Sequence, residues 1–124
     1  MPTIIHFDIP VDDIERAKKF YQELFDWKIE ALPGPMEYYN IFTKNDKGES
    51  GIGGGMSKRQ QPGTGITNYI GVPSVNKYLQ KAQKLGAKII MPKTTVPGFG
   101  YLAVVLDTEN NAIGLWEEDP KAKM

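Results

Sequence analysis

The sequence predicts an α+β fold built from two tandem β–α–β–β–β modules. The main observation is an internal repeat, because residues 6–29 resemble residues 67–89 with apolar positions at a constant offset of 61 (70 − 9). The recurring apolar residues are Ile9, Val11, Ile14 and Leu24 in the first copy and Ile70, Val72, Val75 and Leu85 in the second. The offset continues downstream, where Ile52-Gly53 recurs as Ile113-Gly114. Two copies with so long a period indicate a duplicated half-domain rather than a solenoid.

Composition limits the classes of protein to consider. The 124 residues are enough for one domain with a real core, and the 15 basic and 15 acidic side chains cancel. We therefore expect no nucleic-acid partner. The absence of cysteine excludes a disulfide framework, a thiolate metal site and a catalytic thiol. With no signal-peptide pattern and no apolar run of membrane-spanning length, we expect a cytoplasmic protein with no membrane partner.

The first module is predicted over about residues 3–56, beginning with a strand over residues 3–9. Alternation along this strand places Phe7 and Ile9 on one face and His6 and Asp8 on the other. The apolar face should pack against a helix, and the polar face should lie in a more solvent-accessible environment.

The first helix is predicted to begin after Pro10. Asp12 is predicted as its N-cap, with Glu15 three residues later as in a capping box. The residues expected on the buried stripe of this helix are Ile14, Ala17, Tyr21 and Leu24.

Three strands complete the first module, over residues 27–31, 37–43 and 51–56, with a break at Pro33-Gly34-Pro35. The last of them contains Gly53, Gly54 and Gly55, and glycine is tolerated in a strand chiefly where another backbone or a ligand comes close. A polar linker over residues 57–65 follows and is predicted to be mobile.

The second module, over about residues 66–118, repeats the same plan. Its helix is predicted to be capped by Ser74 and to end at Gly86, a position that favours a left-handed residue. The helix stripe is expected to contain Val75, either Tyr78 or Leu79, Ala82 and Leu85. Strands are predicted over 67–72, 88–91, 101–107 and 112–117, with a loop over 92–98 and a frayed tail over 119–124.

Two segments carry a resemblance to a known family: HFDIPVDDIERAKKFYQELFDWKI at residues 6–29 and LDTENNAIGLWE at residues 106–117. The chain resembles the vicinal oxygen chelate (VOC) superfamily, which includes glyoxalase I, extradiol dioxygenases and the fosfomycin- and bleomycin-resistance proteins. The resemblance covers residues 6–117. It implies one domain over 1–124, with curved mixed sheets around a concave pocket, and a two-fold symmetric homodimer.

The resemblance also identifies the positions that hold a metal ion in metal-dependent members of the family. In this sequence these positions are His6, Gly53, Thr67 and Gly114. A catalytic divalent metal generally needs about three protein donors, and only His6 matches the family pattern. We therefore expect no cofactor, although Asp8 could lend one oxygen and a divalent metal stays open as an alternative.

Strand parity predicts which residues line the pocket. Tyr69 and Trp116 offer flat surfaces with polar tips, which suit a planar ligand. An alternative is that they only fill the space that the glycines vacate. The full set of predicted substrate-binding residues is Tyr69, Trp116, Thr67, Gly53 and Gly114.

Two functions follow from this pocket. The first is a metal-independent binding module for a small, planar molecule, like the bleomycin-resistance proteins. The second is a lyase or isomerase of the glyoxalase type, with His6 and Asp8 as an acid–base pair or with a divalent metal; a dioxygenase is less favoured. The sequence contains no P-loop or dinucleotide-binding glycine motif that would support another mechanism.

Overall fold

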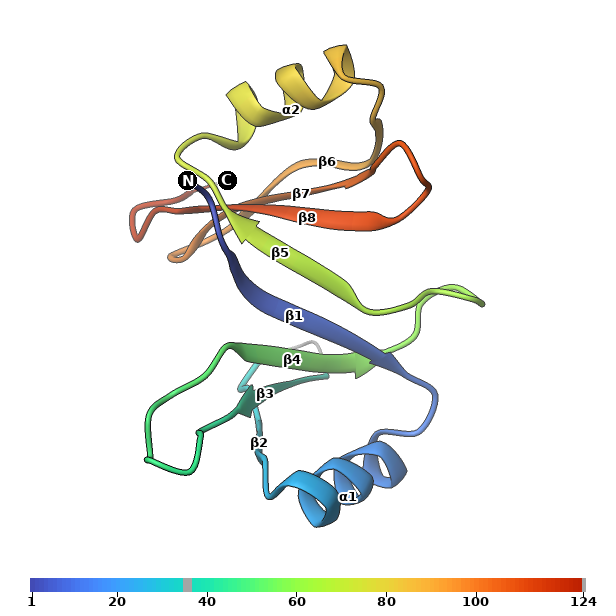
Figure 1. The fold of residues 1–124 in the computed structure, drawn as a ribbon, viewed down its shortest axis with the longest axis vertical. Helices are drawn as coiled ribbons and strands as arrows, with labels where there is room; N and C mark the ends of the chain where they lie inside the picture. Colours follow the sequence, from blue (N-terminus) through green and yellow to red (C-terminus); the bar gives the residue numbers. More distant parts are fainter. Residues whose placement is uncertain (35–36, 124) are drawn as a thin grey trace. The chain divides into compact units, whose positions relative to one another are not determined.

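The computed structural model describes residues 1–34 and 37–123 and contains two compact units (Figure 1). The N-terminal unit comprises residues 6–66, and the C-terminal unit comprises residues 1–5 together with the chain from Thr67 onward. Each unit has the element order β–α–β–β–β and combines parallel and antiparallel strand pairs. The predicted α+β class with two such halves is therefore confirmed. Pro35, the last residue of the predicted break between strands, lies outside the described residues.

The N-terminal unit has the strand order β2-β3-β4-β1, in which β1 and β4 run parallel and the other neighbours antiparallel. Its elements are β1 (Ile4–Val11, of which residues 6–11 belong to this unit), α1 (Ile14–Phe25), β2 (Lys28–Ala31), β3 (Tyr38–Phe42) and β4 (Gly53–Lys58).

The C-terminal unit has the strand order β5-β8-β7-β6, with β5 and β8 parallel. Its elements are β5 (Thr67–Gly71), α2 (Val75–Lys84), β6 (Lys88–Val96), β7 (Gly100–Leu106) and β8 (Ala112–Glu118). The predicted loop over 92–98 is wrong over residues 92–96, because β6 continues through Pro92 to Val96. β6 is the last strand in the order, and its pairing with β7 shifts in register between Ile89 and Thr94, on either side of Pro92. Proline, which has no backbone N–H, is tolerated at such an irregular position on an outer strand.

The cap of α1 differs from the prediction by one residue. Asp13, not Asp12, is the N-cap, and its carboxylate accepts a hydrogen bond from the Arg16 backbone N–H at 3.0 Å. Arg16 rather than Glu15 therefore occupies the third helical position, so the predicted capping box is absent. The Asp12 carboxylate instead pairs with Arg59. In α2 the predicted Ser74 cap and the positive φ of Gly86 (100°) are both confirmed.

The core of the N-terminal unit lies between α1 and one face of the sheet. Its buried residues are Ile9, Val11, Ile14, Ile29, Ile41 and Met56. Leu24 is 58% exposed, so its predicted place in the buried stripe is wrong. Trp27 stacks on Tyr21, with ring centroids 5.2 Å apart, and closes this end of the core in place of Leu24.

The core of the C-terminal unit is built in the same way from α2 and β5, β7 and β8. Its buried residues are Val72, Val75, Leu79, Ala103, Val105 and Leu115. Leu79, rather than Tyr78, is thus the buried residue of the stripe, whereas Leu85 is 68% exposed at the C-cap and was wrongly predicted as buried.

The chain after β8 is ordered rather than frayed. Ala122 is buried, its carbonyl accepts from the Gly98 N–H at 3.0 Å, and the Asp119 N–H donates to the Phe99 carbonyl at 2.8 Å. These bonds fasten residues 119–122 to the β6–β7 turn. The predicted frayed tail is therefore wrong for this segment.

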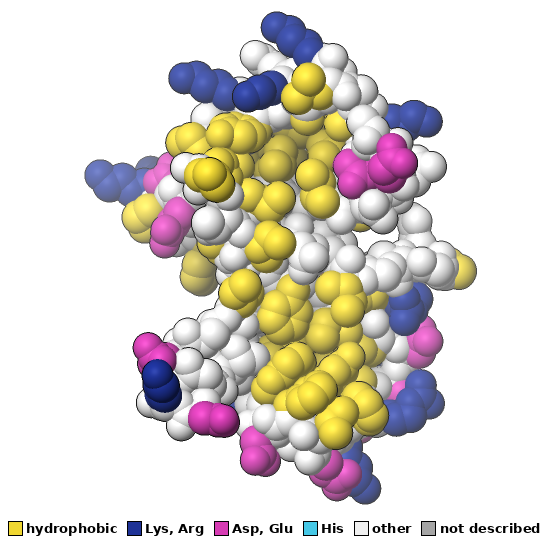
Figure 2. Space-filling model, in the orientation of Figure 1, with side chains coloured by type: hydrophobic (Ala, Val, Ile, Leu, Met, Phe, Trp, Pro, Cys, Tyr) yellow, Lys and Arg dark blue, Asp and Glu magenta, His cyan; other side chains and the backbone are white. Residues whose placement is uncertain are grey.

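Apolar side chains remain at the surface of both units. Figure 2 shows them across the middle of each unit, with charged side chains mainly at the margins of the same face. Among the described residues, no helix is long and apolar enough to cross a membrane.

Candidate functional site

The strand register sets up a polar face on the N-terminal unit. Along β1 and β4, His6 lies opposite Gly53 and Asp8 lies opposite Gly55. Because side chains alternate along a strand, these residues point away from the face that carries Ile9 and the core. The predicted separation of polar and apolar residues along β1 is confirmed.

Three side chains on this face form a closed group of hydrogen bonds, the His6–Asp8–Tyr38 cluster. His6 Nε2 lies 3.0 Å from Asp8 Oδ1 and 3.1 Å from the Tyr38 hydroxyl oxygen. The Tyr38 hydroxyl donates to the same Asp8 Oδ1 at 2.7 Å. The side chains of His6 and Asp8 keep 35% and 31% of their surface exposed, so a small molecule can reach them.

Two glycines of β4 shape the surface around the cluster in different ways. A Cβ at Gly55 would collide with the Tyr38 phenol and would lie 2.7 Å from Asp8 Oδ1, so this position has no room for a side chain. A Cβ at Gly53 would meet only the Ile41 carbonyl oxygen, at 3.3 Å. Among the described residues, position 53, opposite His6, is thus less crowded than position 55.

Tyr38 is the member of the cluster that the sequence analysis missed. The predicted third strand contained the pair Tyr38-Tyr39, but only the register with β4 shows which tyrosine shares a face with Asp8. Tyr39 packs against the core instead. The sequence feature that pointed to this contact was Gly55, because a glycine within a strand indicates that another group comes close. The group that comes close is the Tyr38 phenol.

The remaining predicted pocket residues lie in the C-terminal unit, on β5 and β8. Tyr69 lies opposite Gly114, and Gly71 lies opposite Trp116. The ring of Tyr69 occupies the space that a Cβ at Gly114 would need, and the indole of Trp116 approaches the corresponding space at Gly100 to 3.0 Å. Thr67 begins β5, two residues before Tyr69 on the same face. The Tyr69 ring thus fills the space beside Gly114, and its predicted role in binding a ligand stays a prediction.

The described residues do not bring together the donors that a catalytic metal needs. Among the described residues, no group of three or more His, Asp or Glu side chains lies close enough to hold an ion. His6 Nε2 is engaged by Asp8 and Tyr38, and the Tyr69 ring covers position 114. A site of this kind needs about three donors with free access to one point.

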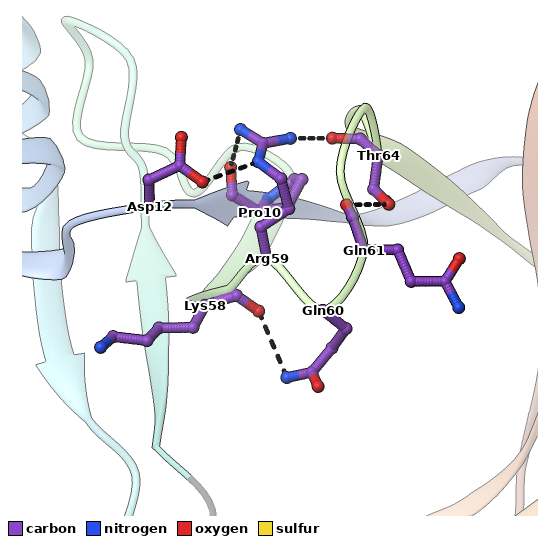
Figure 3. Close-up of polar contacts among 7 residues, drawn as sticks. All are labelled: Pro10, Asp12, Lys58, Arg59, Gln60, Gln61 and Thr64. Carbon is purple, nitrogen blue, oxygen red and sulfur yellow. Dashed lines mark hydrogen bonds and ion pairs between the residues drawn. The ribbon is translucent and has the colours of Figure 1, made fainter.

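A second polar feature of the N-terminal unit is the linker after β4 (Figure 3). The Arg59 guanidinium donates through Nε to Asp12 Oδ1 at 3.0 Å, through Nη2 to the Pro10 carbonyl at 3.3 Å, and through Nη1 to the Thr64 carbonyl. A hollow of about 570 Å³ lies beside these contacts, lined by Asp12, Arg59, Gln60, Gln61, Pro62 and Gly63. Arg59 therefore ties the linker to the end of β1.

Comparison with known proteins gives a consistent result. Residues 3–43 match the family model described as bleomycin resistance protein-like N-terminal. A glyoxylase-like domain-containing protein of Didymella fabae is 31% identical over 114 residues, which cover 84% of each chain. A provisionally assigned glyoxylase of Mycobacterium tuberculosis, CFP32, is 28% identical over 113 residues. Those residues are 89% of this chain but 43% of CFP32, so the chain spans less than half of that relative.

A solved structure shows the same fold. A glyoxalase/bleomycin resistance protein/dioxygenase superfamily member from Vibrio splendidus superposes with a TM-score of 0.69, over 95% of this chain and 100% of that one. The sequences are 10% identical, so this likeness concerns the fold alone.

Proposed function

Because this chain belongs to the glyoxalase/bleomycin resistance/dioxygenase (VOC) superfamily, we propose that it binds a small, planar molecule at the His6–Asp8–Tyr38 cluster without a catalytic metal. The observation that carries the proposal is the cluster itself: an imidazole, a carboxylate and a phenol joined by hydrogen bonds and still partly exposed. Small-molecule sites typically contain a few convergent polar groups that orient the ligand.

The preference for a planar molecule rests on Gly53. Gly53 lies opposite His6 in the strand register, and no side chain covers the backbone at this position. A flat ring can lie on exposed backbone within reach of the imidazole, whereas a bulky, branched molecule gains little contact there. The ligand is therefore expected to stack on the strand and to hydrogen-bond the cluster at its edge.

Filling the surface at Gly53 tests this proposal. We would screen planar aromatic and heteroaromatic compounds by thermal shift against the wild type, Gly53→Val and Gly65→Val. Gly65 is a matched control, because a Cβ there meets no atom within 4 Å and its φ is not positive. A true ligand should stabilise the wild type and Gly65→Val but not Gly53→Val. A compound that stabilises Gly53→Val equally well would show that it does not use this surface.

A second candidate function is a lyase or isomerase of the glyoxalase type that uses His6 as an acid–base group. The observation in its favour is that the imidazole contacts both a carboxylate and a phenol, as expected of an oriented general base. Two relatives are named as glyoxylases or glyoxylase-like. Formation of lactoylglutathione by chelator-treated protein, lost in His6→Ala, would support this function. Activity that needs added metal would contradict it in this metal-free form.

A further inference from the structure

We propose that the outer edge of β6 in the C-terminal unit binds an extended, acidic peptide segment as an additional strand of the sheet. The surface comprises residues 88–94 and is called the β6 edge. It belongs to a different compact unit from the His6–Asp8–Tyr38 cluster. The proposal therefore concerns a second interaction and does not depend on the function proposed for the cluster.

The β6 edge combines a strand without an outer neighbour with exposed apolar side chains. β6 ends the strand order, and among the described residues it pairs with β7 alone. Every residue from 88 to 94 is exposed, including Ile90 at 54% and Met91 at 43%. The outer side of such a strand presents backbone N–H and C=O groups that can pair with another chain. An extended segment would therefore gain main-chain hydrogen bonds and apolar contacts in the same place.

Pro92 limits the part of the edge that can pair. Proline has no backbone N–H, and the Pro92 carbonyl already accepts a hydrogen bond from the Thr94 hydroxyl at 2.9 Å. The pairing of β6 with β7 also shifts in register between Ile89 and Thr94. Main-chain pairing is therefore expected along residues 88–91, which fits a short segment rather than a long strand.

The charge around the β6 edge determines the chemistry of its partner. The chain as a whole is neutral, but residues 60–106 contain five lysines and no aspartate or glutamate. Lys88 and Lys93 lie at either end of the apolar run, and Lys81 and Lys84 lie in the last turn of α2, which packs against β6. None of these lysines forms an ion pair with another described residue. A segment with carboxylates beside its apolar residues is complementary to this surface.

A second copy of β6 is a poor occupant of the same edge. Two copies paired antiparallel on the apolar run 89–91 would bring the lysine at each end of one run close to a lysine of the other. Two copies paired parallel and in register would place each lysine beside its counterpart. Like charges across a strand pair are destabilising, and lysine and proline on outer strands are typical means of avoiding self-association. The same lysines favour an acidic strand.

The test uses a blocked hexapeptide of alternating valine and glutamate, labelled with fluorescein and followed by fluorescence anisotropy. It should bind the wild type, and binding should weaken as the salt concentration rises. The same peptide with lysine in place of glutamate should not bind. Amide exchange at residues 88–91 should slow when the unlabelled acidic peptide is added. Absence of binding, or unchanged exchange at these residues, would overturn the proposal.

A backbone change in the peptide separates strand addition from charge attraction alone. A depsipeptide with ester bonds in place of the amides keeps the carboxylates and the apolar side chains but has no backbone N–H to donate. An added strand donates such groups to its neighbour, so the depsipeptide should bind at least about tenfold more weakly. Equal affinity of the two compounds would show that the peptide does not add to the sheet.

A charge reversal tests the role of the lysines. Lys88→Glu should weaken binding of the acidic peptide by about tenfold. Lys88 is preferred to Lys93, whose Nζ also lies 4.3 Å from the centroid of the Tyr101 ring. Lys47→Glu is the matched control, because Lys47 is an exposed lysine of the other unit and the change in net charge is the same. This variant should bind as the wild type does. Equal weakening in both variants, or binding to phosphatidylserine vesicles with none to the peptide, would overturn the proposal.

Discussion

The Tyr69 ring lies where the side chain of residue 114 would begin, so that Gly114 and Tyr69 are a complementary pair. Position 114 is one of those that hold a metal ligand in metal-dependent relatives, as inferred from the resemblance. At the equivalent position in the first module, Gly53, a Cβ would meet only the Ile41 carbonyl oxygen among the described residues, at 3.3 Å. The two equivalent glycines therefore have different surroundings in the two modules.

This difference predicts unequal costs for the same substitution. Gly114→Ala should lower the free energy of unfolding by about 1–3 kcal/mol, because the added methyl forces the Tyr69 ring to move. Gly53→Ala should cost less, because its Cβ meets one carbonyl oxygen at 3.3 Å. Urea unfolding of both variants measures the difference. The double variant Tyr69→Ala/Gly114→Ala should lose less stability than the two single changes added together, and strict additivity would show that the ring is not the obstacle.

Two apolar residues of α1 should differ strongly in what their replacement by alanine costs. Ile14 is 4% exposed, and Ile14→Ala should cost about 2–5 kcal/mol by the cavity it leaves. Leu24 is 58% exposed, and Leu24→Ala should stay within about 0.5 kcal/mol of the wild type. Chemical denaturation provides the measurement. A large loss in Leu24→Ala would mean that this exposed side chain is covered in solution.

Arg59 should govern the order of the linker more than the stability of the fold. Arg59→Lys keeps the positive charge but cannot reach Asp12 and the Pro10 and Thr64 carbonyls together. Amide exchange over residues 60–64 should become faster, while the free energy of unfolding changes by less than about 1 kcal/mol, because the ion pair is exposed. Lys58→Ala is the control. If amide exchange over residues 60–64 is unchanged in Arg59→Lys, the linker is held by its backbone hydrogen bonds and not by Arg59.

Asp107 should contribute to acid sensitivity. Backbone N–H groups of Asn111 and Glu109 donate to its carboxylate at 2.9 and 2.8 Å and lower its pKa below the usual value. The stabilisation is complete above the ordinary carboxyl pKa of about 3.9 and is lost as the pH falls through the lowered pKa of the folded state. Asp107→Asn, which still accepts hydrogen bonds but does not titrate there, should flatten the stability curve below about pH 4.

Urea midpoints across this acid range would check the Asp107 prediction. Glu109→Gln, in the same turn, is the matched control and should keep the acid limb of the wild type. If Asp107→Asn loses stability at low pH as the wild type does, the ionisation of Asp107 is not linked to folding.

Much of the fold follows from local patterns. Alternation in β1 correctly separated His6 and Asp8 from Phe7 and Ile9, and Ser74 and Gly86 marked the ends of α2. Such signals depend on residues close in sequence, which share a strand face or a helix terminus whatever the rest of the chain does. The errors occurred at element ends, as at Leu24 and Leu85, where periodicity continues but the packing surface does not.

The sequence by itself determined the duplicated β–α–β–β–β plan, the shared strand face of His6 and Asp8, and the shortage of metal donors at positions 53, 67 and 114. Only the tertiary structure decided that Tyr38 joins this pair, that Gly55 admits it, and that Tyr69 fills the space at Gly114. The physical reason is that strand register between segments far apart in the chain chooses which side chains meet. A shift of one residue would have brought Tyr39 to Asp8 in place of Tyr38.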